Sequence, residues 1–89
     1  MEKGFNSDVT LDGIGFHVQT EDWGRENPFL VSRIFRNGAV LKSIKTPYTE
    51  VLPQGNLADP SSVRLAMKVQ HDSILDLLVS GQIKRVSIE

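Results

Sequence analysis

The first half of the chain alternates polar and apolar residues on either side of two turn dipeptides, Asp12-Gly13 and Asn37-Gly38. Type I′ turns match the twist of paired strands but need positive φ at both central positions, which Asp-Gly and Asn-Gly tolerate best. We therefore predict two antiparallel hairpins, with four strands between about residues 5 and 48.

The first hairpin has one apolar face and one polar face. Folding about its turn places Val9 opposite Phe16 on one side and Asp8 opposite His17 on the other. This alternation is typical of a half-buried antiparallel pair. The loop EDWGRENP, residues 21 to 28, then leads to the second hairpin.

The second hairpin is apolar on both faces. Folding about its turn pairs Phe35 with Val40 and Val31 with Ile44. One face then carries Phe29, Val31, Phe35, Val40 and Ile44, and the other carries Leu30, Ile34 and Leu41. A sheet that contains this hairpin needs cover on both sides.

One helix is predicted from about residue 60 to residue 80, after a connection over residues 49 to 59. Asp59 can cap it, Pro60 fits the first helical position, and Gly81 can end it in the left-handed conformation. At 3.6 residues per turn, the stripe facing the sheet comprises Val63, Ala66, Met67, Gln70, Ile74, Leu77 and Leu78. Leu65 and Val69 fall on the outer side of the helix, among charged residues.

These elements predict one α+β domain over residues 1 to 89: a four-stranded antiparallel meander packed by one C-terminal helix. The tail, residues 81 to 89, holds a candidate fifth strand from about Lys84 to Ile88.

One helix covers only one face of a sheet, so the second apolar face predicts an interface. We assign the contact surface to Trp23, Leu30, Ile34 and Leu41. A closed homodimer is the commonest way to bury such a face. The alternative is that the connection, with Val51, Leu52 and Leu57, folds over it.

The candidates for chemistry in the sequence are weak. Glu21, Asp22 and Glu26 do not have the spacing of a calcium loop. Asp8 could orient His17 as a general base, but no nucleophile completes the pair. With only two histidines and no third ligand at fixed spacing, a zinc site is not expected. We therefore predict that the protein is not an enzyme and needs no metal or cofactor.

The composition narrows the class of protein. The chain has 89 residues, a net charge of -1 and no cysteine, which excludes disulfide scaffolds, thiolate metal sites and cysteine nucleophiles. No signal peptide and no run long enough to cross a bilayer is seen, so we expect a cytoplasmic chain, or a piece of a larger one, without a membrane partner.

Four basic residues of the second hairpin support an alternative function. Arg33, Arg36, Lys42 and Lys45 lie among aromatic residues, as in proteins that bind single-stranded nucleic acid or other anions. In the simple register Arg33 and Lys42 point to one face while Arg36 and Lys45 point to the other. Because no face carries all four, and the net charge is near zero, nucleic acid is the weaker expectation.

Three stretches, FHVQTEDWG, NPFLVSRIFRNGAVLKSIKTPY and QHDSILDLLVSGQI, cover most of residues 5 to 83. Together they resemble a group of small uncharacterised bacterial proteins and amino-terminal domains that share a His-Val-Gln-Thr-Glu-Asp core strand. The resemblance implies a bacterial protein that is sometimes fused to other modules, and it transfers no catalytic residue. A portable domain of this kind fits protein interaction or regulation better than catalysis.

Overall fold

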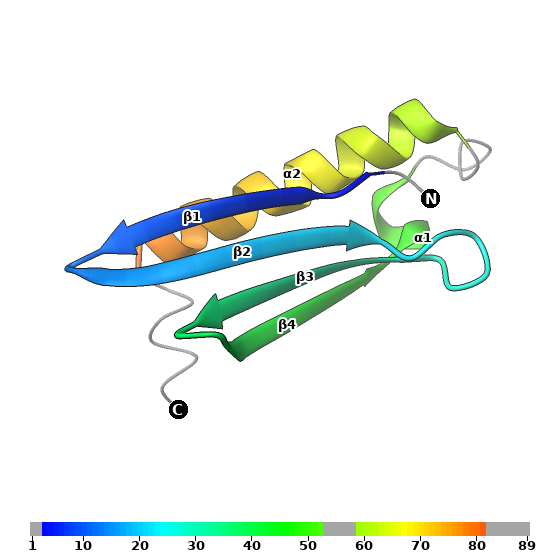
Figure 1. Cartoon of the computed structure of the whole chain (residues 1–89). Coiled ribbons are helices and arrows are strands. Elements are labelled where there is room, and N and C mark those ends of the chain that lie inside the picture. The colour runs from blue at the N-terminus through cyan, green and yellow to red at the C-terminus, as the bar shows by residue number, and fades with distance from the viewer. Residues whose placement is uncertain (1–2, 53–58, 82–89) are drawn as a thin grey trace.

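The computed structural model describes residues 3–52 and 59–81 as a four-stranded antiparallel sheet and two helices (Figure 1). The strands are β1 (Phe5–Leu11), β2 (Ile14–Asp22), β3 (Phe29–Arg36) and β4 (Ala39–Pro47), in the spatial order β1-β2-β3-β4. The short helix α1 (Tyr48–Val51) follows β4, and α2 (Pro60–Val79) lies on one face of the sheet. The α+β meander is thus confirmed, whereas the candidate fifth strand lies outside the described residues.

Both turns adopt the conformation that their sequences predict. Asp12 and Gly13 have φ values of 52° and 78°, and Asn37 and Gly38 have 53° and 78°. Positive φ at both central residues is the requirement of a type I′ turn. In the first hairpin the predicted register is confirmed, since Val9 pairs with Phe16 and Asp8 with His17.

The predicted register of the second hairpin is wrong beyond its first pairs. Phe35 pairs with Val40 as expected, but Arg33 pairs with Ser43 and Val31 with Lys45, because a β-bulge interrupts the ladder between Ile34 and Phe35. The bulge adds one residue to β4. It therefore moves Ile44 to the face that carries α2 and Lys45 to the opposite face.

Helix α2 begins and ends where its capping residues predict. The Asp59 carboxylate accepts a hydrogen bond of 3.0 Å from the Ser61 N–H, and Gly81 has a φ of 84°. Its buried residues are Val63, Ala66, Met67, His71, Ile74 and Leu78. Leu77, which we predicted in this stripe, is exposed, and His71 is buried instead.

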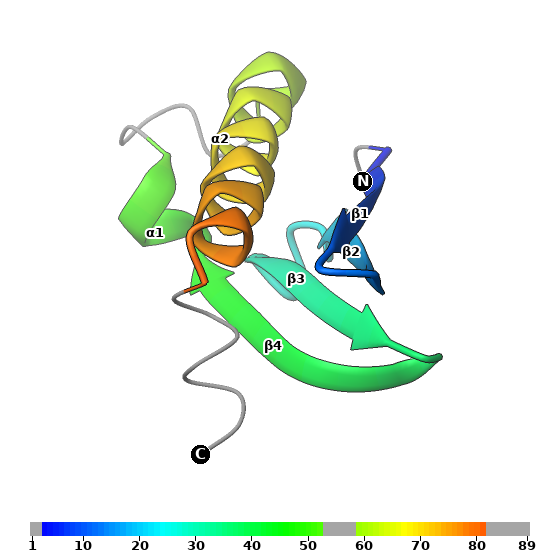
Figure 2. The same ribbon diagram turned by 90° about the vertical axis from the view of Figure 1, so that its left-hand side faces the viewer.

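Figure 2 shows α2 on one side of the sheet. The core consists of two clusters of buried residues from these elements. One is formed by Phe16, Val18, Ile34, Ile74 and Leu78, and the other by Leu30, Tyr48, Leu52, Val63, Ala66 and Met67. The second cluster includes Leu52 of the connection, which packs with residues of α2 and β3.

A chain of buried polar side chains runs between α2 and the sheet. The Thr20 hydroxyl lies 2.8 Å from Nδ1 of His71, and Ser7 lies 2.8 Å from Nε2. On the other side, Thr20 and Ser32 are 2.7 Å apart, and Gln70 donates to Ser32 over 2.9 Å. This order of partners fits a neutral His71 that carries its proton on Nε2.

A second buried polar contact fixes the start of α1. The Tyr48 hydroxyl donates to Asp22, which also accepts a 2.9 Å hydrogen bond from the Gly24 N–H. Burial raises the pKa of the Tyr48 hydroxyl most, and the hydrogen bond to Asp22 raises it further. The group therefore stays protonated and remains a donor.

The buried histidine predicts a pH dependence of stability. Burial lowers the pKa of His71 below its ordinary 6.5, so the unfolded chain binds more protons as the pH falls below that value. We expect the free energy of unfolding to decrease from about pH 6.5 downward, by at most about 1.4 kcal/mol per pH unit. Urea unfolding between pH 5 and 7.5 measures this decrease.

The control separates His71 from the other histidine. His71→Gln removes the titrating group, so its free energy of unfolding is expected to vary less over this pH range than that of the wild type. Equal pH profiles for the wild type and His71→Gln would contradict the expectation.

Candidate functional site

Two of the predicted contact residues are not available for an interface. Leu30 and Ile34 are completely buried, at 0% exposure, within one copy of the chain. Leu41 is half-buried and packs against the same core. The predicted contact surface of Trp23, Leu30, Ile34 and Leu41 is therefore wrong for Leu30 and Ile34, and it does not form one exposed patch.

The reason is the register between the two hairpins. Val18 pairs with Ile34 and Asp22 with Leu30, so Leu30 and Ile34 share the face on which α2 packs. The sequence of the loop between β2 and β3 does not fix this register, and a slip of one residue would turn every side chain to the other face.

The opposite face carries no helix in the described part of the chain, yet its apolar residue Val31 is only 3% exposed. Its cross-strand neighbours are Glu21 and Lys45. The Lys45 ammonium lies 5.1 Å from the ring centre of Trp23 and 4.2 Å from that of Phe29. Long and aromatic side chains thus cover this face, and Trp23 is half-buried as part of that cover.

The four basic residues do not form one anion site. On β3, Arg33 lies on the open face and Arg36 on the side of α2. The bulge in β4 places Lys45 on the open face and Lys42 on the side of α2. Arg33 already forms an ion pair of 2.9 Å with Glu21. This arrangement gives little support to nucleic-acid binding.

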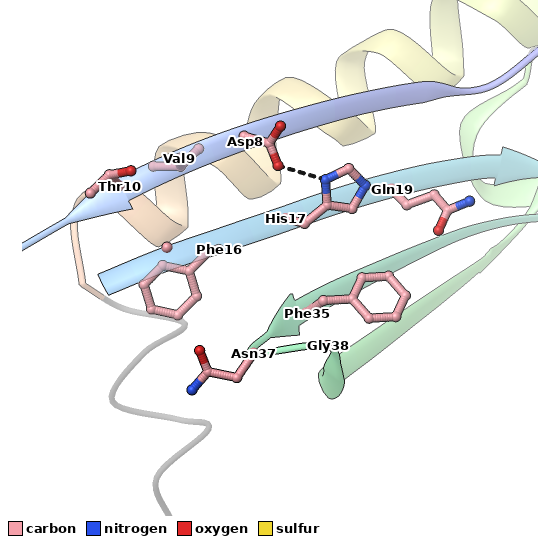
Figure 3. A pocket seen from close by; sticks show the side chains of 10 residues that line it. Asp8, Val9, Thr10, Phe16, His17, Gln19, Phe35, Asn37 and Gly38 are labelled. Carbon is pink, nitrogen blue, oxygen red and sulfur yellow. Dashed lines mark hydrogen bonds and ion pairs between the residues drawn. The ribbon is translucent and has the colours of Figure 1, made fainter. Parts of the chain in front are cut away.

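A hollow of about 420 Å³ lies on the open face beside Asp8 and His17 (Figure 3). Gly15 forms part of its lining, and a Cβ placed on Gly15 would meet no atom within 4 Å. His17 contacts Asp8 through Nδ1 at 2.8 Å and Asn6 through Nε2 at 3.2 Å. Since both ring nitrogens already have partners, the pair is not arranged as a general base.

The described residues also lack a metal site, since they contain no cluster of three histidine, aspartate or glutamate side chains able to hold an ion.

The larger surface feature is an apolar groove of about 620 Å³ between α2, α1 and β4, which we call the α2–β4 groove. It exists because α2 packs mainly on β2 and β1, so that β4 is only partly covered on the side of α2, where Leu41 and Ile44 reach the core. The lining residues are Ile44, Thr46, Val51, Ser62, Leu65, Ala66, Val69, Gln70, Ser73, Ile74 and Leu77.

Large apolar side chains are exposed along the α2–β4 groove. Leu65 is 64% exposed and Val69 is 58% exposed, and Val51 and Leu77 are also among the exposed large hydrophobic residues. Sequence reasoning noted Leu65 and Val69 but missed Ile44, Val51 and Leu77 as parts of one site. The spacing of four and eight residues between Leu65, Val69 and Leu77 is the signal of a second apolar stripe.

Comparison of the chain with family models, with curated proteins and with solved structures finds no match. The resemblance to small bacterial proteins therefore stays a prediction. None of the described helices is long and apolar enough to cross a membrane.

The burial of Ile34 gives a direct test of its corrected role. Ile34→Ala leaves a cavity among Phe16, Val18, Ile74 and Leu78, and we expect the free energy of unfolding to fall by about 2–5 kcal/mol. Leu41→Ala, at the partly exposed margin, should cost less. Urea unfolding measures both variants. A change in oligomeric mass by light scattering, without a loss of stability, would restore Ile34 to an interface.

Proposed function

We propose that the chain is a small cytoplasmic protein-interaction domain without catalytic chemistry, and that the α2–β4 groove is its docking surface. The observation that carries the proposal is the exposure of Leu65, Val69, Leu77 and Val51 around one groove. Contiguous exposed apolar area on a small domain usually marks a site of interaction. The lack of cysteine among the 89 residues is compatible with the cytoplasmic location.

The groove has the features of a binding site and not of a gap in the core. The Asp59 cap and the buried side of α2 hold the helix in place without any contribution from Leu65 or Val69. Polar groups, among them Thr46, Ser73 and Gln70, interrupt the apolar lining. An apolar surface with a few polar groups is typical of a recognition site.

Catalysis is the weaker reading of the same structure. Among the described residues, the groove is lined by no acidic, basic or histidine side chain, and the Asp8–His17 pair lies on the other face of the sheet. Nucleic-acid binding is also less well supported than protein binding, because the four basic residues are divided between two faces.

Polar substitutions in the groove test the proposal. Leu65→Gln with Val69→Gln should keep the fold, because both side chains are mostly exposed, but should lose partner binding. Val79→Gln is the matched control, since Val79 is 62% exposed and does not line the groove. Circular dichroism and urea unfolding verify that the three proteins are equally folded.

The measurement is capture of partners by each protein, followed by reconstitution with the purified candidate. We expect the wild type and Val79→Gln to bind at least about ten times more tightly than the groove double variant, as loss of about 1.4 kcal/mol implies. Light scattering covers self-association, which the same double variant should abolish. Equal binding for all three proteins, or equal mass for all three where the wild type self-associates, would refute the groove as a docking surface.

A further inference from the structure

We propose that the α2–β4 groove takes an extended peptide of a partner protein, which adds as an antiparallel strand to the edge of β4 and carries alternating apolar and acidic residues. This inference rests on the proposed function and specifies the class of partner. Three observations support it: the position of β4 in the sheet, the groove beside it, and the charges that it carries.

Strand β4 is an edge of the sheet in the described part of the chain, with β3 as its neighbour on one side. Alternate backbone N–H and C=O groups of an edge strand point outward and can pair with another strand. At the other edge, α2 packs directly on β1, and Val9 and Leu11 contact the core.

The groove lies where the side chains of an added strand would point. Residues directly opposite each other in an antiparallel pair place their side chains on the same face. Ile44 and Thr46 face the groove, so the peptide residues opposite them would enter it and meet Leu65, Val69 and Leu77. Pairing to an edge strand beside a helix, with pockets for alternate side chains, is an established mode of peptide recognition.

The charges of β4 select the peptide. Its only charged side chains are Lys42 and Lys45, and it contains no acidic residue. Because of the bulge, Lys42 lies on the side of α2 and Lys45 on the open face. Acidic residues opposite these two lysines would form cross-strand pairs, and like charges there would be unfavourable.

The lysines argue against two other occupants. Lysines along an edge strand commonly prevent it from pairing with a second copy of itself, and β4 carries Lys42 on one face and Lys45 on the other. Residues 82–89 of the chain carry Lys84 and Arg85 against Glu89, a balance of two positive charges and one negative, so they lack the acidic character that β4 selects.

Together these positions define a sequence. Read from its N-terminus, an antiparallel peptide has an apolar residue opposite Thr46, an acid opposite Lys45, an apolar residue opposite Ile44, any residue opposite Ser43, and an acid opposite Lys42. Val-Glu-Val-Thr-Glu is the simplest example. Val-Lys-Val-Thr-Lys is its charge-reversed control.

Fluorescence polarisation with these two labelled peptides, flanked by serine and glycine, tests the inference on the full chain. At low salt we expect the acidic peptide to bind about two- to fivefold more tightly for each lysine it faces. Lys45→Glu should reduce this preference and improve binding of the basic peptide. The Leu65→Gln, Val69→Gln double variant should weaken the acidic peptide about tenfold or more, while Val79→Gln should leave it unchanged.

Backbone pairing is tested with two further acidic peptides, N-methylated on the two alternate sets of amides. Only one set can face β4, so only one of the two peptides should lose binding. Equal affinity for the acidic and basic peptides, or no effect of either methylation, would overturn the inference. A chain ending at Gly81 that binds the acidic peptide at least about ten times better than the full chain would also overturn it, since residues 82–89 would then occupy the site.

The two proposals can fail separately. If a reconstituted partner depends on Leu65 and Val69 but the acidic peptide does not bind, the docking surface stands and the strand addition is rejected. If the groove double variant also binds partners and peptides like the wild type, both are rejected.

Discussion

The hydrogen-bonded chain through His71 determines where α2 lies on the sheet. His71 contacts both Ser7 on β1 and Thr20 on β2, and Gln70 reaches Ser32 on β3. An apolar helix face could slide over an apolar sheet with little loss, whereas a buried donor or acceptor that loses its partner costs about 1–3 kcal/mol. The polar chain therefore holds α2 over β1, β2 and β3, and as a consequence β4 is only partly covered.

Local sequence signals predicted the elements well, because the turns and caps are decided within a few residues. Asn37-Gly38 fixes its turn through the φ angles of two residues, and Asp59 caps the helix through its own side chain. The placement of Leu30 and Ile34 depends instead on pairing between β2 and β3 across a loop that permits more than one register. The sequence also gives no signal for the bulge in β4, since neither a glycine nor a proline lies next to Leu41.

The second apolar face of β3 is covered by side chains and not by a second layer of helices or strands in the described part of the chain. Val31 is only 3% exposed on the open face, where its cross-strand neighbours are Glu21 and Lys45, and the cationic groups of Lys45 and Arg33 lie over the ring of Trp23. Counting helices alone overstated the need for a partner on this face. The exposed apolar residues lie instead at the edge of the sheet, beside β4. Assigning strand residues to the two faces of a sheet does not predict a site at its edge.

In the proposed function, helix α2 separates the requirements of folding and binding on its two sides. Met67 and Leu78 are fully buried, and His71 is hydrogen-bonded, so changes there act on stability. Leu65 and Val69 contribute little to the core and can change without unfolding the domain. A helix divided in this way lets one scaffold keep its fold while its groove is adapted to a partner. The bulge in β4 places Ile44 toward the groove and Lys45 on the other face. The proposed peptide would therefore meet side chains on both faces of this strand.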